Sequence, residues 1–306
     1  MPSKEYSEVV QAMQAQAASM IEADLTLEQQ REAMEAGFAF PLQDDVTLTA
    51  VDVNGVPGEW TVLADSDPSR RLLYVHGGGY VLGSINTHRR LVADICRAAG
   101  CVALSLDYRL APEHPYPAAV DDAISGLEYI WANGPDGGSD VASVFVGGDS
   151  AGGGLMLATL FAARERGVPM PTGGIGLSAW ADLAASPEEL SAFGLDDPTI
   201  PDNTVAITAS QEWAAMYAGD ADRNDPQLSP VFGDYEGICP LLLQAGSVEM
   251  ICRDTERVAA RARDAGVEVV EEIWDDMFHV WQGFAPMLPE GREAIDHIGE
   301  WIREHA

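Results

Sequence analysis

The fold of this chain is decided by one stretch, Val144-Phe145-Val146-Gly147-Gly148-Asp149-Ser150-Ala151-Gly152-Gly153-Gly154. An apolar, β-branched run leads into a turn of small residues, and a helix-like segment from Leu155 to Ala163 follows directly. The pattern predicts a strand, a sharp turn and a helix, and residues 148–152 match G-x-S-x-G. A serine at such a turn is strained, so residues two positions away must be small. The helix would direct its N–H groups at the serine oxygen, which suits a nucleophile; alternatively, the turn packs or binds a phosphate.

The rest of the chain alternates between expected strands and helices. Two β-type runs at 46–53 and 59–64 flank a turn-rich connection and predict a hairpin. Further strands are expected at 71–75, 102–108, 172–180, 240–245 and 267–274, and helices at 87–99, 117–131, 254–265 and 291–305. This alternation predicts an α/β fold with a mostly parallel sheet, helices on both faces and an antiparallel start.

Two segments stand outside this alternation. Residues 5–36 have helical spacing and precede the first strand, so they are free to cover something. Residues 184–226 form an acidic, proline-containing loop with one helix near 204–217. An insertion of that length usually has a task such as covering a pocket.

The composition restricts the function. The 306 residues include 49 acidic and 17 basic ones, for a net charge of -32. Such a surface disfavours nucleic acid, anionic membranes and strongly anionic substrates. The four cysteines lack metal-ligand spacing, so we expect reduced thiols. Without a signal peptide or an apolar run long enough to span a membrane, we expect a cytoplasmic protein.

A glycine run supplies a second element of chemistry. His76-Gly77-Gly78-Gly79 follows the expected strand at 71–75. Consecutive glycines let backbone N–H groups point into a site without obstruction by side chains. We expect the N–H groups of Gly78, Gly79 and Ala151 to form an oxyanion hole, with His76, Gly77 and Asp149 as support. The alternative is a flexible loop with no such role.

A histidine and a carboxylate complete the candidate set. His279 follows the last strand, where an open α/β sheet places functional groups, and is the predicted base. The acid should follow the strand that ends at Ala245. Glu249 is close to that strand end, whereas Asp254 begins a helix and suits a cap. We favour Glu249, with Asp254 as the alternative; the order Ser, Glu, His fits an α/β-hydrolase triad.

These motifs resemble those of the hormone-sensitive-lipase-like bacterial esterases. The resemblance rests on His76–Tyr80, Tyr108–Glu113 and Gly148–Gly153, and also on Trp180–Leu183 and Asp225–Pro230. It covers about residues 56–300 and implies an α/β-hydrolase fold with an eight-stranded sheet and an N-terminal helical cap. We therefore expect a cap segment at 1–45 and a catalytic domain at 46–306, with 184–226 as a cap insertion. Many members carry Asp-Pro-Leu at the triad acid, where this chain has Glu249-Met250-Ile251.

The resemblance implies hydrolysis of carboxylic esters with short to medium acyl chains, without metal or cofactor. A lactone hydrolase or amidase with the same triad is the nearest alternative, and a non-catalytic ligand-binding protein is a distant one. The expected partner is a small neutral ester or lactone, and a homodimer stays open. Arg109 and Glu113 are predicted to form an internal ion pair that holds the loop under His76.

Overall fold

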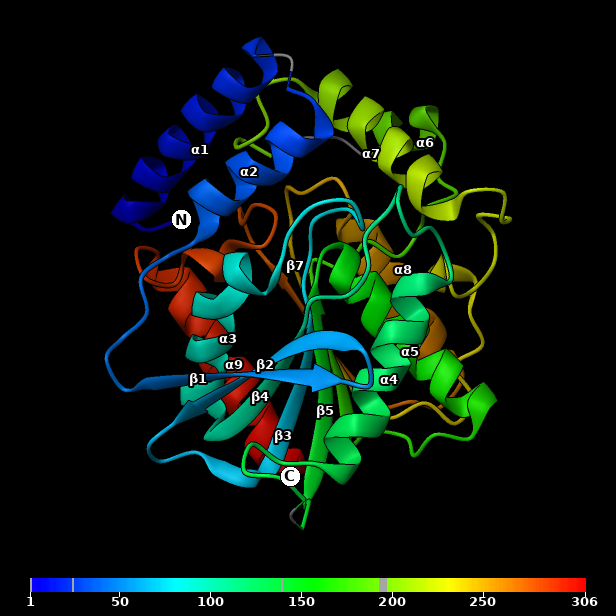
Figure 1. The fold of residues 1–306 in the computed structure, drawn as a ribbon. Coiled ribbons are helices and arrows are strands. Elements are labelled where there is room, and N and C mark those ends of the chain that lie inside the picture. Colours follow the sequence, from blue (N-terminus) through cyan, green and yellow to red (C-terminus); the bar gives the residue numbers. More distant parts are fainter. Residues whose placement is uncertain (1, 24, 139, 193–196) are drawn as a thin grey trace.

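Residues 2–23, 25–138, 140–192 and 197–306 are described by the computed structural model, and over these residues the chain forms one eight-stranded sheet between two layers of helices (Figure 1). The strands are β1 (Val46–Val53), β2 (Val56–Leu63), β3 (Asp67–Val75), β4 (Cys101–Leu106), β5 (Ser143–Asp149), β6 (Gly173–Leu177), β7 (Leu241–Gly246) and β8 (Val269–Trp274). Their order is β1-β2-β4-β3-β5-β6-β7-β8. β2 is antiparallel to β1 and β4, and the remaining pairs are parallel. The predicted α/β class and mostly parallel sheet are confirmed.

Side-chain alternation along the central strands builds two cores. Leu72 and Tyr74 of β3 belong to one buried cluster, whereas Leu73 and Val75 belong to another. Successive side chains of a strand point to opposite faces, so each face needs its own helical cover. The first cluster is completed by α3 (Ile85–Ala99) and α9 (Pro289–His305), and the second by α4 (Ala118–Ala132), α5 (Ala151–Arg166) and α8 (Cys252–Asp264).

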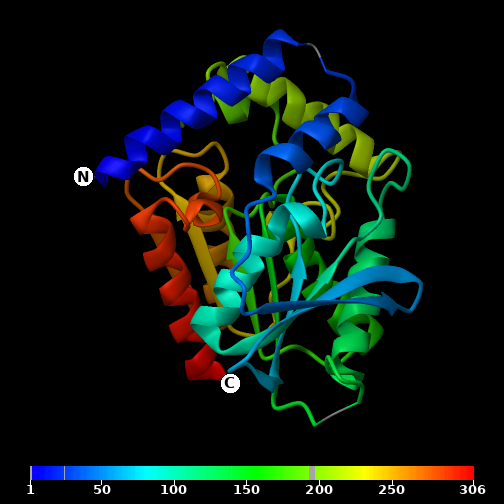
Figure 2. The same cartoon turned by 60° about the vertical axis from the view of Figure 1, so that its left-hand side comes forward.

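Helices from outside the βα alternation lie above the carboxyl ends of the parallel strands, at the top of Figures 1 and 2. They include α1 (Lys4–Glu22), α2 (Leu27–Phe38) and α7 (Asn203–Ala218), with the short α6 (Pro187–Ala192) beside α7. Val9 and Val10 of α1 pack against Phe278 and Trp281, next to the predicted base. The N-terminal segment and the insertion therefore both lie at the edge of the sheet where the parallel strands end.

Some boundaries differ from the sequence-based expectation. β3 begins at Asp67 rather than at 71, and β6 ends at Leu177 because Ser178 has a positive φ of 48° and turns the chain. The short α6 (Pro187–Ala192) was not predicted, nor were the 3-10 turns η1 (Pro230–Phe232) and η2 (Trp281–Phe284). All four cysteines are free and buried. None of the helices in the described part of the chain combines the length and apolar character needed to cross a bilayer.

Candidate active site

Ser150 lies at the turn between β5 and α5. Its φ of 53° and ψ of -122° are rare for a residue with a side chain, which is the strained geometry expected of this turn. Its N–H donates to the Leu177 carbonyl at 2.8 Å. A Cβ atom on Gly148 would lie 2.3 Å from the Gly152 carbonyl oxygen, and one on Gly152 would lie 2.1 Å from that of Val75. The two glycines of the motif are therefore required by close backbone approach.

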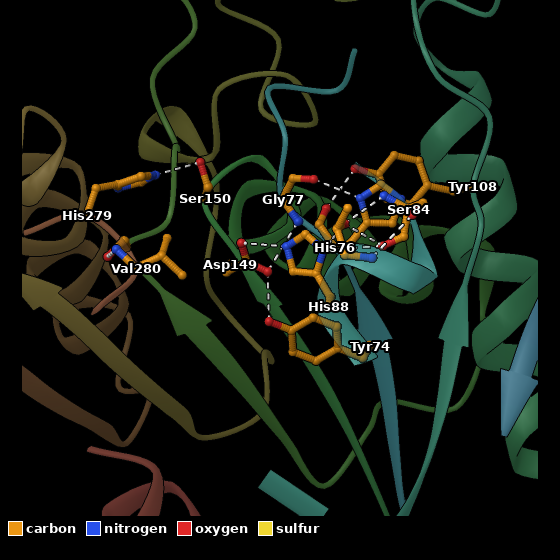
Figure 3. A network of polar contacts seen from close by, with 12 residues as sticks. Tyr74, His76, Gly77, Ser84, His88, Tyr108, Asp149, Ser150, His279 and Val280 are labelled. Carbon is orange, nitrogen blue, oxygen red and sulfur yellow. Dashed lines mark hydrogen bonds and ion pairs between the residues drawn. The ribbon is translucent and has the colours of Figure 1, made fainter. Parts of the chain in front are cut away.

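The structure brings Ser150, His279 and Glu249 together from three separate strand ends. The Nε2 atom of His279 lies 2.9 Å from Ser150 Oγ (Figure 3), and its Nδ1 atom lies 2.5 Å from Glu249 Oε2. The other Glu249 oxygen accepts the Gly246 N–H at 2.8 Å, and the glutamate side chain is fully buried. With the proton on Nδ1, His279 can donate to Glu249 while Nε2 accepts the serine proton.

The surroundings of His279 favour its protonated form. Burial by itself would lower the pKa of the imidazole, but the hydrogen bond and charge of Glu249, with smaller contributions from Asp197 and Asp149, raise it above the ordinary value. About a third of the side chain is exposed (35%), and this part faces the cavity that contains Ser150. The imidazole can thus receive a proton and keep it while a reaction proceeds.

Asp254, the alternative acid, lies elsewhere. Its Oδ2 atom accepts the backbone N–H groups of Ala181 and Asp182 at 2.9 and 3.0 Å. Burial, the largest influence, raises the pKa of this carboxyl to about 7. Asp254 thus holds the segment that follows β6, and the carboxylate that contacts His279 is that of Glu249.

The glycine loop borders the same space. Gly78 and Gly79 line the cavity beside Ser150. Ala151 is the first residue of α5, so its N–H belongs to the first turn, whose donors have no acceptor within the helix. The three predicted oxyanion donors are thus on backbone that adjoins the serine.

Asp149 supports this loop from below (Figure 3). Its Oδ1 atom accepts the Tyr74 hydroxyl at 2.7 Å and the Gly77 N–H at 3.2 Å, and its Oδ2 atom lies 3.3 Å from His88 Nε2. Burial would raise the pKa of Asp149, but His88 and the Tyr74 hydrogen bond lower it overall. Asp149 is therefore an ionised acceptor that ties the glycine loop to β5.

His76 is a neutral member of the same network. Its ring stacks on Tyr108 with centroids 4.3 Å apart, and Nδ1 donates to the Gly77 carbonyl at 2.7 Å. Burial, aided by the nearby His88, lowers the pKa of His76 to about 3. This ring fixes the loop and carries no charge at neutral pH.

The prediction that Arg109 pairs with Glu113 is wrong. Arg109 binds Asp122 on α4, with Nη2 2.6 Å from Oδ1. Glu113 instead pairs with Arg31 of α2 at 2.7 Å. Arg31 also donates to the carbonyls of Val81 and Ala111. Helix α2, which precedes the first strand, therefore holds the segment that follows the glycine loop. The pair was inferred from proximity in the sequence, but the partner of Glu113 comes from a helix that is distant in the sequence.

A cavity of about 390 Å³ contains Ser150 and His279. Its lining is mostly apolar and comes from both segments outside the alternation, with Met13, Met34, Phe38 and Phe40 from the N-terminal part and Ala206, Ala209 and Trp213 from α7. Trp213 and Asp197 also line the cavity, and neither was predicted from the sequence to belong to the site. No motif marks them; their position in a long insertion was the available signal.

Comparison with known proteins agrees with this geometry. A family model described as the alpha/beta hydrolase fold matches residues 72–283. The chain belongs to the α/β-hydrolase family. This hydrolase is 39% identical over 255 residues to an acetyl-hydrolase from Streptomyces hygroscopicus, with 83% of this chain and 81% of the relative covered. It is 31% identical over 263 residues to an esterase from Acinetobacter venetianus, with 86% and 84% covered.

Solved structures show which group of α/β-hydrolases this protein is similar to. An esterase from the bacterial hormone-sensitive lipase family matches with a TM-score of 0.91 and 40% identity, over 100% of this chain and 99% of that one. The esterase EstE5, in crystals soaked with p-nitrophenyl butyrate, matches with a TM-score of 0.90 and 39% identity, over 99% of both chains. The predicted resemblance is thus confirmed, and the protein is a carboxylic ester hydrolase of the hormone-sensitive-lipase-like group.

Proposed function

We propose that this hydrolase is a serine carboxylesterase that works through an acyl-enzyme. The observation that carries the proposal is the continuous contact from Ser150 Oγ through the His279 ring to Glu249, at 2.9 and 2.5 Å. A weak nucleophile next to a base that is itself oriented by a buried carboxylate is the arrangement that activates serine.

In this mechanism, His279 Nε2 takes the proton of Ser150 as Oγ attacks the ester carbonyl. The N–H groups of Gly78, Gly79 and Ala151 stabilise the negative charge that develops on the carbonyl oxygen; one such donor is worth about 10²–10³ in kcat. His279 then protonates the leaving alcohol, and Glu249 stabilises the imidazolium between the two transfers. A water molecule, deprotonated by His279, hydrolyses the acyl-enzyme and restores Ser150.

We further propose that residues 1–45 and the insertion at 184–226 form a cap that shapes the substrate site of the catalytic domain at 46–306. Phe40 and Trp213, which line the cavity from these two segments, support this role. The size of the cavity and its apolar lining favour short to medium neutral acyl chains. Arg90 also lines it, but its Nε pairs with Asp94 at 2.8 Å and is not offered to an anionic substrate.

The test compares wild type with Ser150→Ala on p-nitrophenyl esters from acetate to laurate, beside a lactone and an anilide of matched size. We expect the substitution to abolish turnover and labelling by a fluorophosphonate probe, and activity to peak at short to medium acyl chains. Undiminished turnover in Ser150→Ala would refute the serine mechanism. A preference for the lactone or the anilide would reassign the substrate class on the same residues.

A further inference from the structure

The backbone around His279 has an unfavourable conformation. Val280 has a φ of 51° and a ψ of 44°, the left-handed region that β-branched residues rarely adopt. Such a conformation is strained and persists only where its surroundings hold it in place. The Val280 N–H donates to Ser178 Oγ at 3.1 Å, which supplies one of these contacts. Figure 3 shows Val280 directly beside His279.

The second contact comes from the insertion. The backbone N–H of His279 donates to Asp197 Oδ2 at 3.1 Å. Asp197 is 3% exposed and lines the same cavity as Ser150 and His279. The insertion therefore contacts the loop that carries His279 through a buried carboxylate.

Asp197 is itself fixed in place. Its Oδ1 atom accepts the N–H and the hydroxyl of Thr199 at 2.8 and 2.6 Å. Gln14 of α1 donates to the neighbouring Pro198 carbonyl at 2.6 Å. Tyr6 of the same helix donates to the Asp276 carbonyl at 2.7 Å. Helix α1 therefore contacts both the turn that carries Asp197 and the loop that carries His279.

The charges around the base come from several elements. Glu249 after β7, Asp149 on β5 and Asp197 all act on His279, and each raises the pKa of the imidazole. On α1, Tyr6 faces the same region, and its pKa rises to about 12 through burial and then through the charges of Asp197 and Asp276. In the described part of the chain, no ion pair with a lysine or arginine is found for Asp197. Among the described residues, its negative charge therefore acts on its surroundings with no arginine or lysine in an ion pair with it.

We propose that Asp197 is a positioning residue for the base, whose carboxylate holds the His279 peptide and adds to the negative charge that Glu249 and Asp149 place near the imidazole. The inference rests on the proposed role of His279 as the base. Glu249 and Asp197 then have different tasks, because Glu249 binds the ring and Asp197 binds the backbone that carries it. The insertion that contributes to the substrate cavity also aligns the catalytic machinery.

Two substitutions separate the hydrogen bond from the charge. Asp197→Asn removes the charge but keeps one oxygen, which can still accept the His279 N–H while the amide NH2 group faces Thr199, whereas Asp197→Ala removes the charge and both acceptors. Asp202→Asn is the matched control, because Asp202 is exposed on the same insertion and caps α7, a task that asparagine performs equally well. Each variant is assayed for kcat and KM across pH, with thermal unfolding as the check on folding.

In Asp197→Asn we expect kcat within a few-fold of wild type and the acidic limb of the kcat/KM profile displaced to lower pH by roughly 0.5 unit, as for one partly screened charge. In Asp197→Ala we expect kcat to fall by about tenfold with KM little changed, because a misplaced base lowers the rate more than binding. Asp202→Asn should leave both quantities unchanged.

Full kcat in Asp197→Ala, or an acidic limb in Asp197→Asn that coincides with that of Asp202→Asn, would overturn the inference. The profile of Asp197→Asn provides the test even if Asp197→Ala fails to fold. Failure of the serine mechanism itself would appear separately, as activity retained by Ser150→Ala.

Discussion

Replacement of Glu249 by glutamine tests the assignment of the triad acid. The substitution keeps the shape of the side chain but removes the charge that lies 2.5 Å from His279 Nδ1. A carboxylate and an imidazolium whose charges are about 4 Å apart interact by about 4 kcal/mol at an effective dielectric constant of about 20. Since about 1.4 kcal/mol corresponds to tenfold, loss of this interaction in the transition state lowers kcat by roughly 10³. The amide can also stabilise the wrong imidazole tautomer, and a comparable change in serine proteases costs about 10⁴.

Asp254→Asn is the counterpart of this substitution. Asp254 already has a pKa of about 7, and an amide oxygen can accept the same two N–H groups from Ala181 and Asp182. We therefore expect kcat within about threefold of wild type. The assay is kcat on p-nitrophenyl butyrate at neutral pH, with circular dichroism to show that both variants are folded. A loss in Asp254→Asn as large as that in Glu249→Gln, or an active Glu249→Gln, would refute the assignment.

Three further predictions concern the supports of the site. Arg31→Ala should lower kcat several-fold and the melting temperature by a few degrees, since Arg31 holds the Val81 carbonyl; Arg97→Ala, which breaks the exposed pair with Asp45, is the control in the same assays. His88→Leu should lower the free energy of unfolding by about 3 kcal/mol in urea titrations, because it removes the ion-pair partner of the buried Asp149 and leaves the carboxylate only its hydrogen bonds from Tyr74 and Gly77. Because the folded-state pKa of Asp254 is raised, its contribution to stability falls as pH rises from about 4 to about 7, so Asp254→Asn should gain stability relative to wild type over that range in the same titrations.

The fold was predictable because its determinants are local. The run before Ser150 is apolar on both faces, as a strand buried between two helical layers requires. Glycines at 148 and 152 are dictated by backbone contacts that the motif already implies. The ends of elements were harder to predict, because β3 extends to Asp67 through pairing with neighbouring strands and not through its own pattern.

The candidate site was predictable to the extent that its residues follow strands. Ser150, Glu249 and His279 each come after a parallel strand, and parallel strands present their carboxyl ends at one edge. The choice between Glu249 and Asp254 needed the path of the chain, because both follow β7 and both are buried carboxyls. Asp197 was missed because its position depends on how a long insertion folds back over the sheet.

The residues that support the site come from different parts of the chain than the residues proposed to react. The residues proposed to react follow strands of the sheet, but Arg31 on α2 and Asp197 in the insertion hold backbone groups next to the glycine loop and at His279. In both contacts a side chain binds a backbone group of a loop. The contact therefore fixes the position of the loop backbone and does not occupy the side chains of the loop. The segments that line the cavity beside Ser150 therefore also hold the loops around it. Changes in these segments that alter substrate preference are therefore expected to alter kcat as well as KM, since the same backbone contacts set both cavity shape and the alignment of the base.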